Sequence, residues 1–210
     1  MSQFLAPIHA WLFNKISILE NIEKDIANSL ETKELKDKHE ALLKEFGGFI
    51  PDEPLENLID QSNIHGWLQE RITVAERRQA SLVNELMEVS SDAVEGISNI
   101  YETAGYTNAL SHGLKVDEPS EIYKLLGDAL LEGMPCDRVN RVAEQNQEKI
   151  SWLTVTCVHK LNWEQAGVAI ENYYSFREAF TRGFVRGLNE EMTYTYTLTD
   201  QQQQFHQITK

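Results

Sequence analysis

The sequence has only two cysteines and no long apolar run. Cys136 and Cys157 are too few for the disulfide framework of a small secreted domain. No segment approaches the roughly 18 consecutive apolar residues that a membrane-spanning helix needs. The first residues, "MSQFLAPIHAWLFNK", lack the basic start of a signal peptide. Together these absences predict a cytoplasmic protein with free thiols and no membrane association.

Basic residues are also scarce. Lysine and arginine total 19 against 33 acidic residues, which gives a net charge of −14. Phosphate backbones and anionic membrane surfaces attract clustered Lys and Arg, and no local run of bases reverses the overall sign. The sequence therefore predicts neither a nucleic-acid partner nor a membrane partner.

Several common catalytic and nucleotide-binding motifs are missing. The chain has no G-x-G-x-x-G, no P-loop and no Gly-x-Ser-x-Gly elbow. Nucleotide binding through those loops and hydrolysis by an elbow serine are thus unsupported. What is present is a composition typical of a folded protein, with 41% hydrophobic and 25% charged residues.

Apolar residues at steps of three and four predict helices through most of the chain. The first should cover 7–30, with Pro7 in its first turn, and the second 33–46, ending at a Gly-Gly pair. Asn63 or Ser62 should cap a third long helix. Further helices are expected to end at Gly105 and before Gly133, and a short one to follow Asp137. Residues 1–147 are therefore predicted to form a helical bundle of about five or six helices.

The pattern changes near residue 148. "KISWLTVTCVHK" (149–160) is typical of a strand, and a long helix should follow from Asn162. "MTYTYTLT" alternates strictly, and "QFHQITK" should form a last strand. Residues 148–210 are thus predicted to be a β-α-β-β unit packed with the bundle as one compact body. The predicted fold class is α+β, mostly α, with the bundle on a small antiparallel sheet.

Cys157 and His159 are the first candidates for chemistry. Alternation along the predicted strand places both on one face, about 7 Å apart. That spacing suits two ligands of a metal such as zinc, and it equally suits a thiol activated by an imidazole. The competing interpretation is a small core cysteine beside a strand-end histidine.

Cys136 is the second candidate thiol. It precedes Asp137, the predicted cap of a helix, whose aligned N–H groups would favour thiolate. The alternative is a loop cysteine that fills the junction between bundle and sheet. If Cys136 meets Cys157 and His159, the three form a ligand set or a thiol–imidazole site.

Histidines on helical apolar stripes are the third candidates. His9 and His65 are favoured over His39 because each has a tryptophan two residues later, Trp67 in the case of His65. Imidazoles that project from several helices build metal and haem sites in bundles. The Glu-x-x-His motif of di-iron bundles is absent. Satisfied core-edge histidines are the alternative interpretation.

Residues from about 138 onward resemble the aminothiazoline-carboxylate hydrolase-like proteins and related vinyl-reductase-type small-ligand domains. The similarity rests on "VTCVHK", "WEQAG", "ENYYSFREAFTRGF" and "YTYTLTDQQQQFHQI". It implies a small-molecule or metal pocket between helices and sheet, with Cys157 as the thiol that carries over. The further cysteines of those families are replaced here, at Tyr173 and at Phe205 or His206. The pattern Tyr173-x-Ser175-x-Arg177 is also similar to one in haem-nitric-oxide-binding domains, but it falls within a predicted helix and is interpreted as coincidence.

Three functions remain open on this evidence. The first is a binding or sensor protein that holds a metal ion, a haem or a small apolar ligand between bundle and sheet, and candidate ligands are Cys136, Cys157, His159, His9 and His65. The second is a thiol-dependent enzyme that acts on a small molecule through Cys157 or Cys136, with His159 as base. The third is a protein-interaction module without chemistry. Assembly into a homo-oligomer is compatible with each of them.

Overall fold

The computed structural model describes residues 5–199 and 203–210. It is mostly helical with a four-stranded antiparallel sheet in its C-terminal part, which confirms the predicted α+β class. The chain forms two compact units. Unit 1 contains the residues up to Ala93 together with His159–Ala169, and unit 2 contains Val94–Val158 and Ile170–Lys210. Because the chain passes from one unit to the other and back, neither unit is a single consecutive segment.

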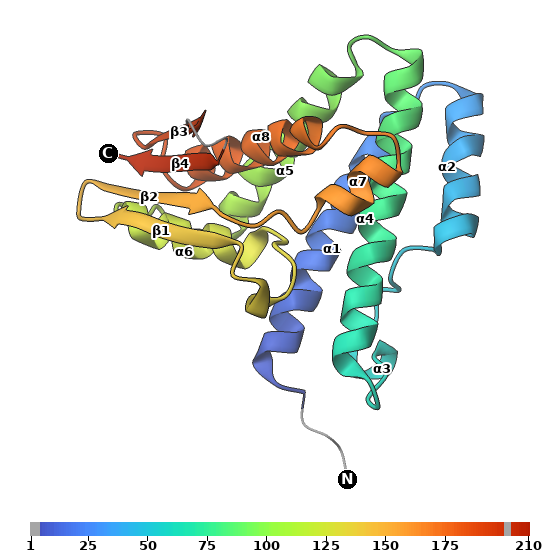
Figure 1. The fold of residues 1–210 in the computed structure, drawn as a ribbon, viewed down its shortest axis with the longest axis horizontal. Coiled ribbons are helices and arrows are strands. Elements are labelled where there is room, and N and C mark those ends of the chain that lie inside the picture. The colour runs from blue at the N-terminus through green and yellow to red at the C-terminus, as the bar shows by residue number, and fades with distance from the viewer. Residues whose placement is uncertain (1–4, 200–202) are drawn as a thin grey trace. The chain divides into compact units, whose positions relative to one another are not determined.

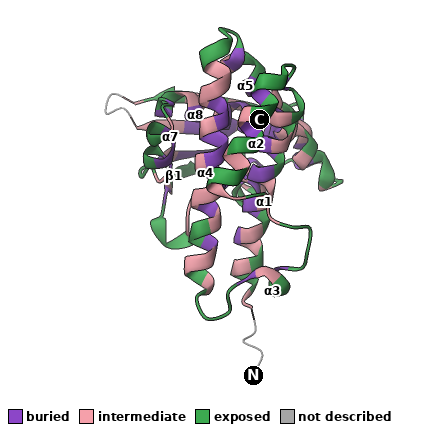
Figure 2. Cartoon of the chain, turned by 90° about the vertical axis from the view of Figure 1, so that its right-hand side faces the viewer, coloured by how far each residue is buried: buried purple, intermediate pink, exposed green. Residues whose placement is uncertain are grey.

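Unit 1 is helical, and two of its long helices run in the same direction. Its elements are α1 (Pro7–Asn28), α2 (Lys33–Phe46), α3 (Leu55–Leu58), α4 (Ile64–Val89) and α7 (Lys160–Gln165). Helix α2 returns antiparallel along α4, and α1 lies beside α4 (Figure 1). Buried positions recur along α1 and α4 (Figure 2), as the apolar stripes predict. The Asn63 side chain accepts a hydrogen bond from the Gly66 N–H, so the predicted cap of α4 forms.

Unit 2 combines the sheet with three α-helices and one 3-10 helix in its described residues. Its elements are α5 (Ala93–Ser111), α6 (Pro119–Ala129), the short 3-10 helix η1 (Pro135–Asp137), β1 (Asn140–Gln145), β2 (Lys149–Thr154), α8 (Ile170–Leu188), β3 (Thr193–Leu198) and β4 (Gln204–Thr209). The strand order is β1-β2-β4-β3. Trp152 of β2 pairs with His206 of β4, which pairs with Tyr196 of β3, so these side chains share one face of the sheet. The predicted alternation of β3 is confirmed, since its threonines are exposed.

The sheet differs from the predicted β-α-β-β unit in three places. Strand β1 forms where a short helix was expected, because it pairs with β2 although five of its six residues are exposed. Strand β2 ends at Thr154, opposite the first residues of both antiparallel partner strands, so the predicted strand to residue 160 is wrong. The predicted long helix is broken between α7 and α8 at Gly167, whose φ of 85° does not fit a right-handed helix.

Two glycines let the backbones of α5 and α8 touch. A Cβ atom on Gly105 would lie 2.1 Å from the Phe180 carbonyl oxygen, and one on Gly183 would lie 2.0 Å from that of Glu102. Helix α5 therefore continues through Gly105 to Ser111, rather than ending there as the sequence predicted. Gly105 is a contact residue and not a helix stop.

No helix in the described residues is long and apolar enough to cross a membrane.

This contact predicts a large difference between two glycine-to-alanine variants. Gly183→Ala should lower the free energy of unfolding by about 1–3 kcal/mol, because the added methyl group forces the two helix backbones apart. Gly127→Ala in α6, where an added Cβ meets nothing within 4 Å, should be neutral or stabilising by up to about 1 kcal/mol. Urea denaturation of both variants measures the difference, and equal stabilities would contradict the close contact.

Candidate functional site

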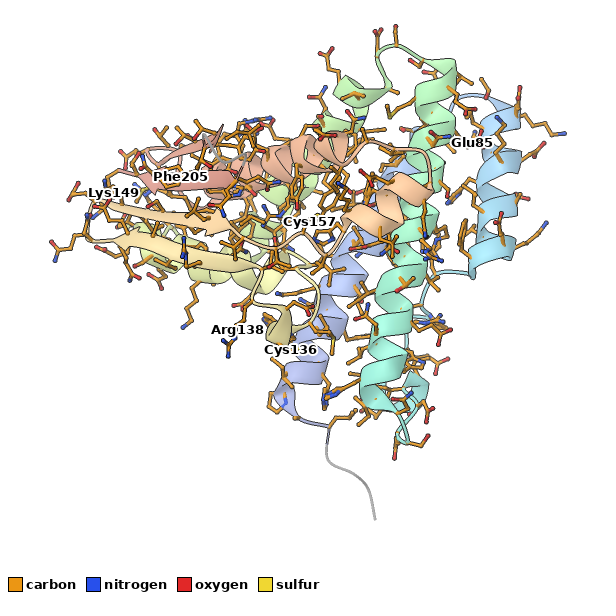
Figure 3. All side chains as sticks on the ribbon, in the orientation of Figure 1. Glu85, Cys136, Arg138, Lys149, Cys157 and Phe205 are labelled. Atoms are coloured by element: carbon orange, nitrogen blue, oxygen red, sulfur yellow. The ribbon has the colours of Figure 1, made fainter. Side chains whose placement is uncertain are left out.

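The two cysteines are free and lie apart. Cys136 is exposed in η1, and Cys157 is exposed in the loop that follows β2. They occupy separate places in unit 2 (Figure 3), so the condition for a shared site of the two thiols, which the sequence left open, is not met. Among residues 5–199 and 203–210, no group of three or more His, Cys, Asp or Glu side chains is arranged to hold a metal ion.

His159 is held by carboxylate and amide groups within unit 1. Its side chain is 1% exposed, and its Nδ1 lies 2.6 Å from Glu76 Oε1. The Asn162 amide donates to the other oxygen of Glu76 at 2.6 Å. Since β2 ends at Thr154, the alternation that placed Cys157 and His159 on one strand face does not reach them. One side chain is exposed in unit 2 and the other is buried in unit 1.

His9 and His65, by contrast, are brought together. Both lie in the first turn of their helices, and their Nε2 atoms are 3.3 Å apart. Trp67 stacks on Phe13, with ring centroids 6.2 Å apart and an interplanar angle of 30°. The third candidate, His39, lies deeper in unit 1 and contacts Glu23 at 3.2 Å.

A group of buried and half-buried polar side chains in unit 2 lies on one face of the sheet and on the helices packed with it. We call it the Arg177 cluster; it consists of Tyr123, Glu132, Arg177, Tyr194, Tyr196 and His206. Arg177, from α8, is 4% exposed and forms an ion pair with Glu132, which follows α6. Its Nε is buried and has no hydrogen-bond partner in the described part of the chain.

Burial and the guanidinium charge shift the pKa values of the tyrosines in the Arg177 cluster, and burial also acts on Arg177 itself. Burial lowers the pKa of Arg177, and the neighbouring tyrosines oppose that fall. Burial raises the pKa of Tyr123 and Tyr194, while the charge of Arg177 works in the opposite direction. The result is a buried cation beside protonated phenols, which can donate or accept hydrogen bonds.

His206 is a neutral imidazole fixed on both ring nitrogens. Its Nδ1 lies 2.8 Å from the Tyr194 hydroxyl, and its Nε2 lies 3.2 Å from Thr154 Oγ1. The ring stacks on Trp152 at a centroid distance of 5.0 Å and an interplanar angle of 7°. Burial, together with the charge of Arg177, lowers the pKa of His206 to about 2. His206 is therefore neutral over the physiological pH range.

Cys157 is connected to this region through Tyr174 of α8. Burial raises the pKa of Tyr174, and a hydrogen bond with the Cys157 thiol adds to the rise. The Gln204 side chain also hydrogen-bonds Tyr174, and its Oε1 is buried without a partner in the described residues. Cys157, one of the predicted site residues, thus contacts the helix that carries Arg177.

A second feature of unit 2 is a surface hollow of about 390 Å³ where α5 and α8 end. Its basic side chains are already paired: Lys115 with Glu191 at 2.7 Å, and Arg186 with Glu102 at 2.8 Å. The hollow therefore offers a ligand little unmatched charge, and the Arg177 cluster is the better candidate.

In the sequence Arg177 stands out only within the pattern Tyr173-x-Ser175-x-Arg177, which was set aside as coincidence, although a second signal for the Arg177 cluster is present. Arg177 lies on the same helix as the apolar positions Tyr173, Phe176, Phe180 and Phe184, which the spacing assigns to the core. A charged residue within such a face indicates a buried ion, which needs a partner. The partner Glu132 is 45 positions away in the sequence, and the spacing gives no means of finding it.

Comparison of the chain with protein-family models, with curated proteins and with solved structures finds no match.

Proposed function

We propose that the chain binds a small carboxylate, and that the Arg177 cluster holds it. The observation that carries the proposal is the buried guanidinium, which has one carboxylate partner and an Nε without a hydrogen bond in the described residues. Buried donors are normally paired, because an unpaired one loses its hydration without replacement. A ligand oxygen that accepts from Nε would supply the missing bond.

A carboxylate is favoured over other ligand groups by the shape of the guanidinium. Nε and Nη2 present two parallel N–H donors, which match the two oxygens of a carboxylate. Glu132 contacts Nη2 alone, so it leaves half of that edge unused. Because Glu132 also neutralises Arg177, an incoming carboxylate has to compete with it.

Aromatic rings suggest the character of the rest of the ligand. The rings of Tyr123 and Trp152 lie 4.7 Å apart, and those of Tyr196 and His206 lie 5.2 Å apart. Small-ligand sites typically combine such apolar and aromatic surfaces with a few polar groups that fix orientation. A carboxylate with a flat apolar body fits this description better than a highly charged metabolite.

The experiment compares small carboxylates with their matched neutral amides. Thermal unfolding of the wild-type chain should shift upward with a binding carboxylate and not with the corresponding amide. Arg177→Lys should weaken binding at least about tenfold, because the two-point contact is lost. Arg182→Lys, on the exposed side of the same helix and paired with Glu102, is the matched control and should bind like wild type. Equal shifts with acids and amides would refute the proposal.

A substitution at Glu132 should change the affinity for the carboxylate ligand in the opposite direction. Glu132→Gln removes the competing carboxylate, so the affinity for the carboxylate ligand should rise by about tenfold, measured by isothermal titration calorimetry. If affinity falls instead, Glu132 contacts the ligand directly and the proposed role of Arg177 is wrong. This variant keeps a polar side chain of the same size at the half-buried position, and thermal unfolding without ligand shows whether unit 2 remains folded.

A further inference from the structure

The imidazoles of His9 and His65 face one another in unit 1, far from each other in the sequence. Each projects from the first turn of a long helix, and the side-by-side, same-direction packing of α1 and α4 brings the two first turns together (Figure 1). The Nε2 atoms are 3.3 Å apart, and the ring centroids are 5.3 Å apart with an interplanar angle of 62°. The rings thus meet through their nitrogen edges rather than by stacking.

We propose that His9 and His65 together bind one divalent transition-metal ion of the zinc class through their Nε2 atoms. The site lies in unit 1 and uses no residue of the Arg177 cluster. Its existence is therefore independent of the proposed carboxylate binding.

The separation of the two nitrogens matches what a tetrahedral ion requires. Zinc holds imidazole nitrogens at about 2.0–2.1 Å, so two of them on one tetrahedral ion lie about 3.3 Å apart. The observed 3.3 Å is longer than an ordinary nitrogen hydrogen bond, which is commonly about 2.9–3.0 Å. The pair is therefore arranged as a two-nitrogen chelate that needs little movement to accept an ion.

The surroundings leave this pair available. His9 Nδ1 is buried and has no hydrogen-bond partner in the described residues, so its Nε2 contact with His65 is the polar contact that the structure gives this ring. His65 is exposed, and water can complete the coordination from that side. The positive ends of two helix dipoles oppose a cation here, but their effect is small beside direct nitrogen coordination.

Calorimetric titration of the tag-free protein with zinc chloride tests the site. The wild type should bind about one ion per chain, and His9→Ala or His65→Ala should weaken binding by about 100-fold, because one imidazole alone loses the chelate effect. His112→Ala, which removes a histidine from unit 2, is the matched control and should leave the isotherm unchanged. Far-UV circular dichroism checks that each variant is folded. His65 is exposed, so His65→Ala should disturb the fold less than His9→Ala.

Two results would overturn the proposal. One is an isotherm for His65→Ala that matches the wild type, which would place any bound zinc elsewhere. The other is saturation at half an ion per chain with a doubling of mass in light scattering. In that case the pair is a bridging contact between two copies and not a site within one chain.

Discussion

Replacing Arg78 with methionine will lower the free energy of unfolding of unit 1 by about 3–5 kcal/mol. The Arg78 side chain is fully buried, and its Nε donates to both oxygens of Glu23 at 2.8 and 3.0 Å. Nη2 donates to Glu20 at 3.0 Å, and Nη1 to the carbonyl oxygens of Gly47 and Gly48. The Arg78 guanidinium, carried by α4, thus hydrogen-bonds both helix α1 and the loop after α2.

The reason for so large an effect is the charge that the substitution leaves behind. Burial by itself lowers the pKa of Arg78, but Glu23 and Glu20 outweigh it and raise the pKa overall. Without the guanidinium, two carboxylates that are 0% and 3% exposed lose their counter-charge. Breaking a buried ion pair costs more than the pair itself contributes, because the remaining ion stays out of water after losing its counter-ion.

Urea denaturation of Arg78→Met measures this loss, and the adjacent arginine supplies the control. Arg77 donates to Asn162 and Gln165 on α7 and is only half-buried, so Arg77→Met should cost less than about 1 kcal/mol. Adding Glu20→Gln and Glu23→Gln to Arg78→Met should recover part of the loss. If Arg78→Met and Arg77→Met have equal free energies of unfolding, the buried network around Arg78 is not a major source of stability.

Acidification from pH 6.5 to 4.5 will lower the free energy of unfolding of unit 2 by about 2 kcal/mol through His206 alone, with a slope that approaches about 1.4 kcal/mol per pH unit. In the unfolded chain this imidazole takes up a proton near the ordinary histidine pKa of 6.5, whereas in the folded chain its pKa is lowered to about 2. Between these values the unfolded state binds one more proton than the folded state. The contribution of His206 to stability is therefore constant above pH 6.5 and falls steadily as the pH drops towards 2.

His206→Gln should flatten this pH dependence. Urea denaturation at pH 7.0, 5.5 and 4.5 gives the slope for the wild type and the variant. The variant starts from a lower stability at pH 7.0, because glutamine does not replace the stack on Trp152, but it loses less on acidification. Identical slopes for the wild type and the variant would assign the acid sensitivity to other groups.

Local sequence signals account for most of the helices. The apolar stripe of α1, the Asn63 cap of α4 and the alternation of β3 each depend on residues a few positions apart, and each forms as predicted. These features are decided within a turn or a strand. The pairing of His9 with His65 is not decided by local patterns. The sequence marks each imidazole as a candidate ligand, but the contact between them depends on the parallel packing of α1 and α4.

The candidate site depends on contacts that local patterns do not contain. Strand β1 is stable only as the partner of β2, since its own residues are mostly exposed. Cys157 and His159 lie beyond the end of β2 because no neighbouring strand in the described residues extends that far, so the face they were predicted to share does not exist. The ion pair and the pKa of Arg177 depend on Glu132 and on tyrosines of β3, which lie on other elements.

The sequence by itself therefore determined the fold class, the helical periodicity, the N-terminal cap of α4 and the scarcity of basic charge. Each of these follows from residue types or from neighbours along one element. Only the tertiary structure decided where the strands end, which histidines meet and which arginines are buried. A strand needs a partner and a buried charge needs a counter-ion, and in this chain both come from residues distant in the sequence.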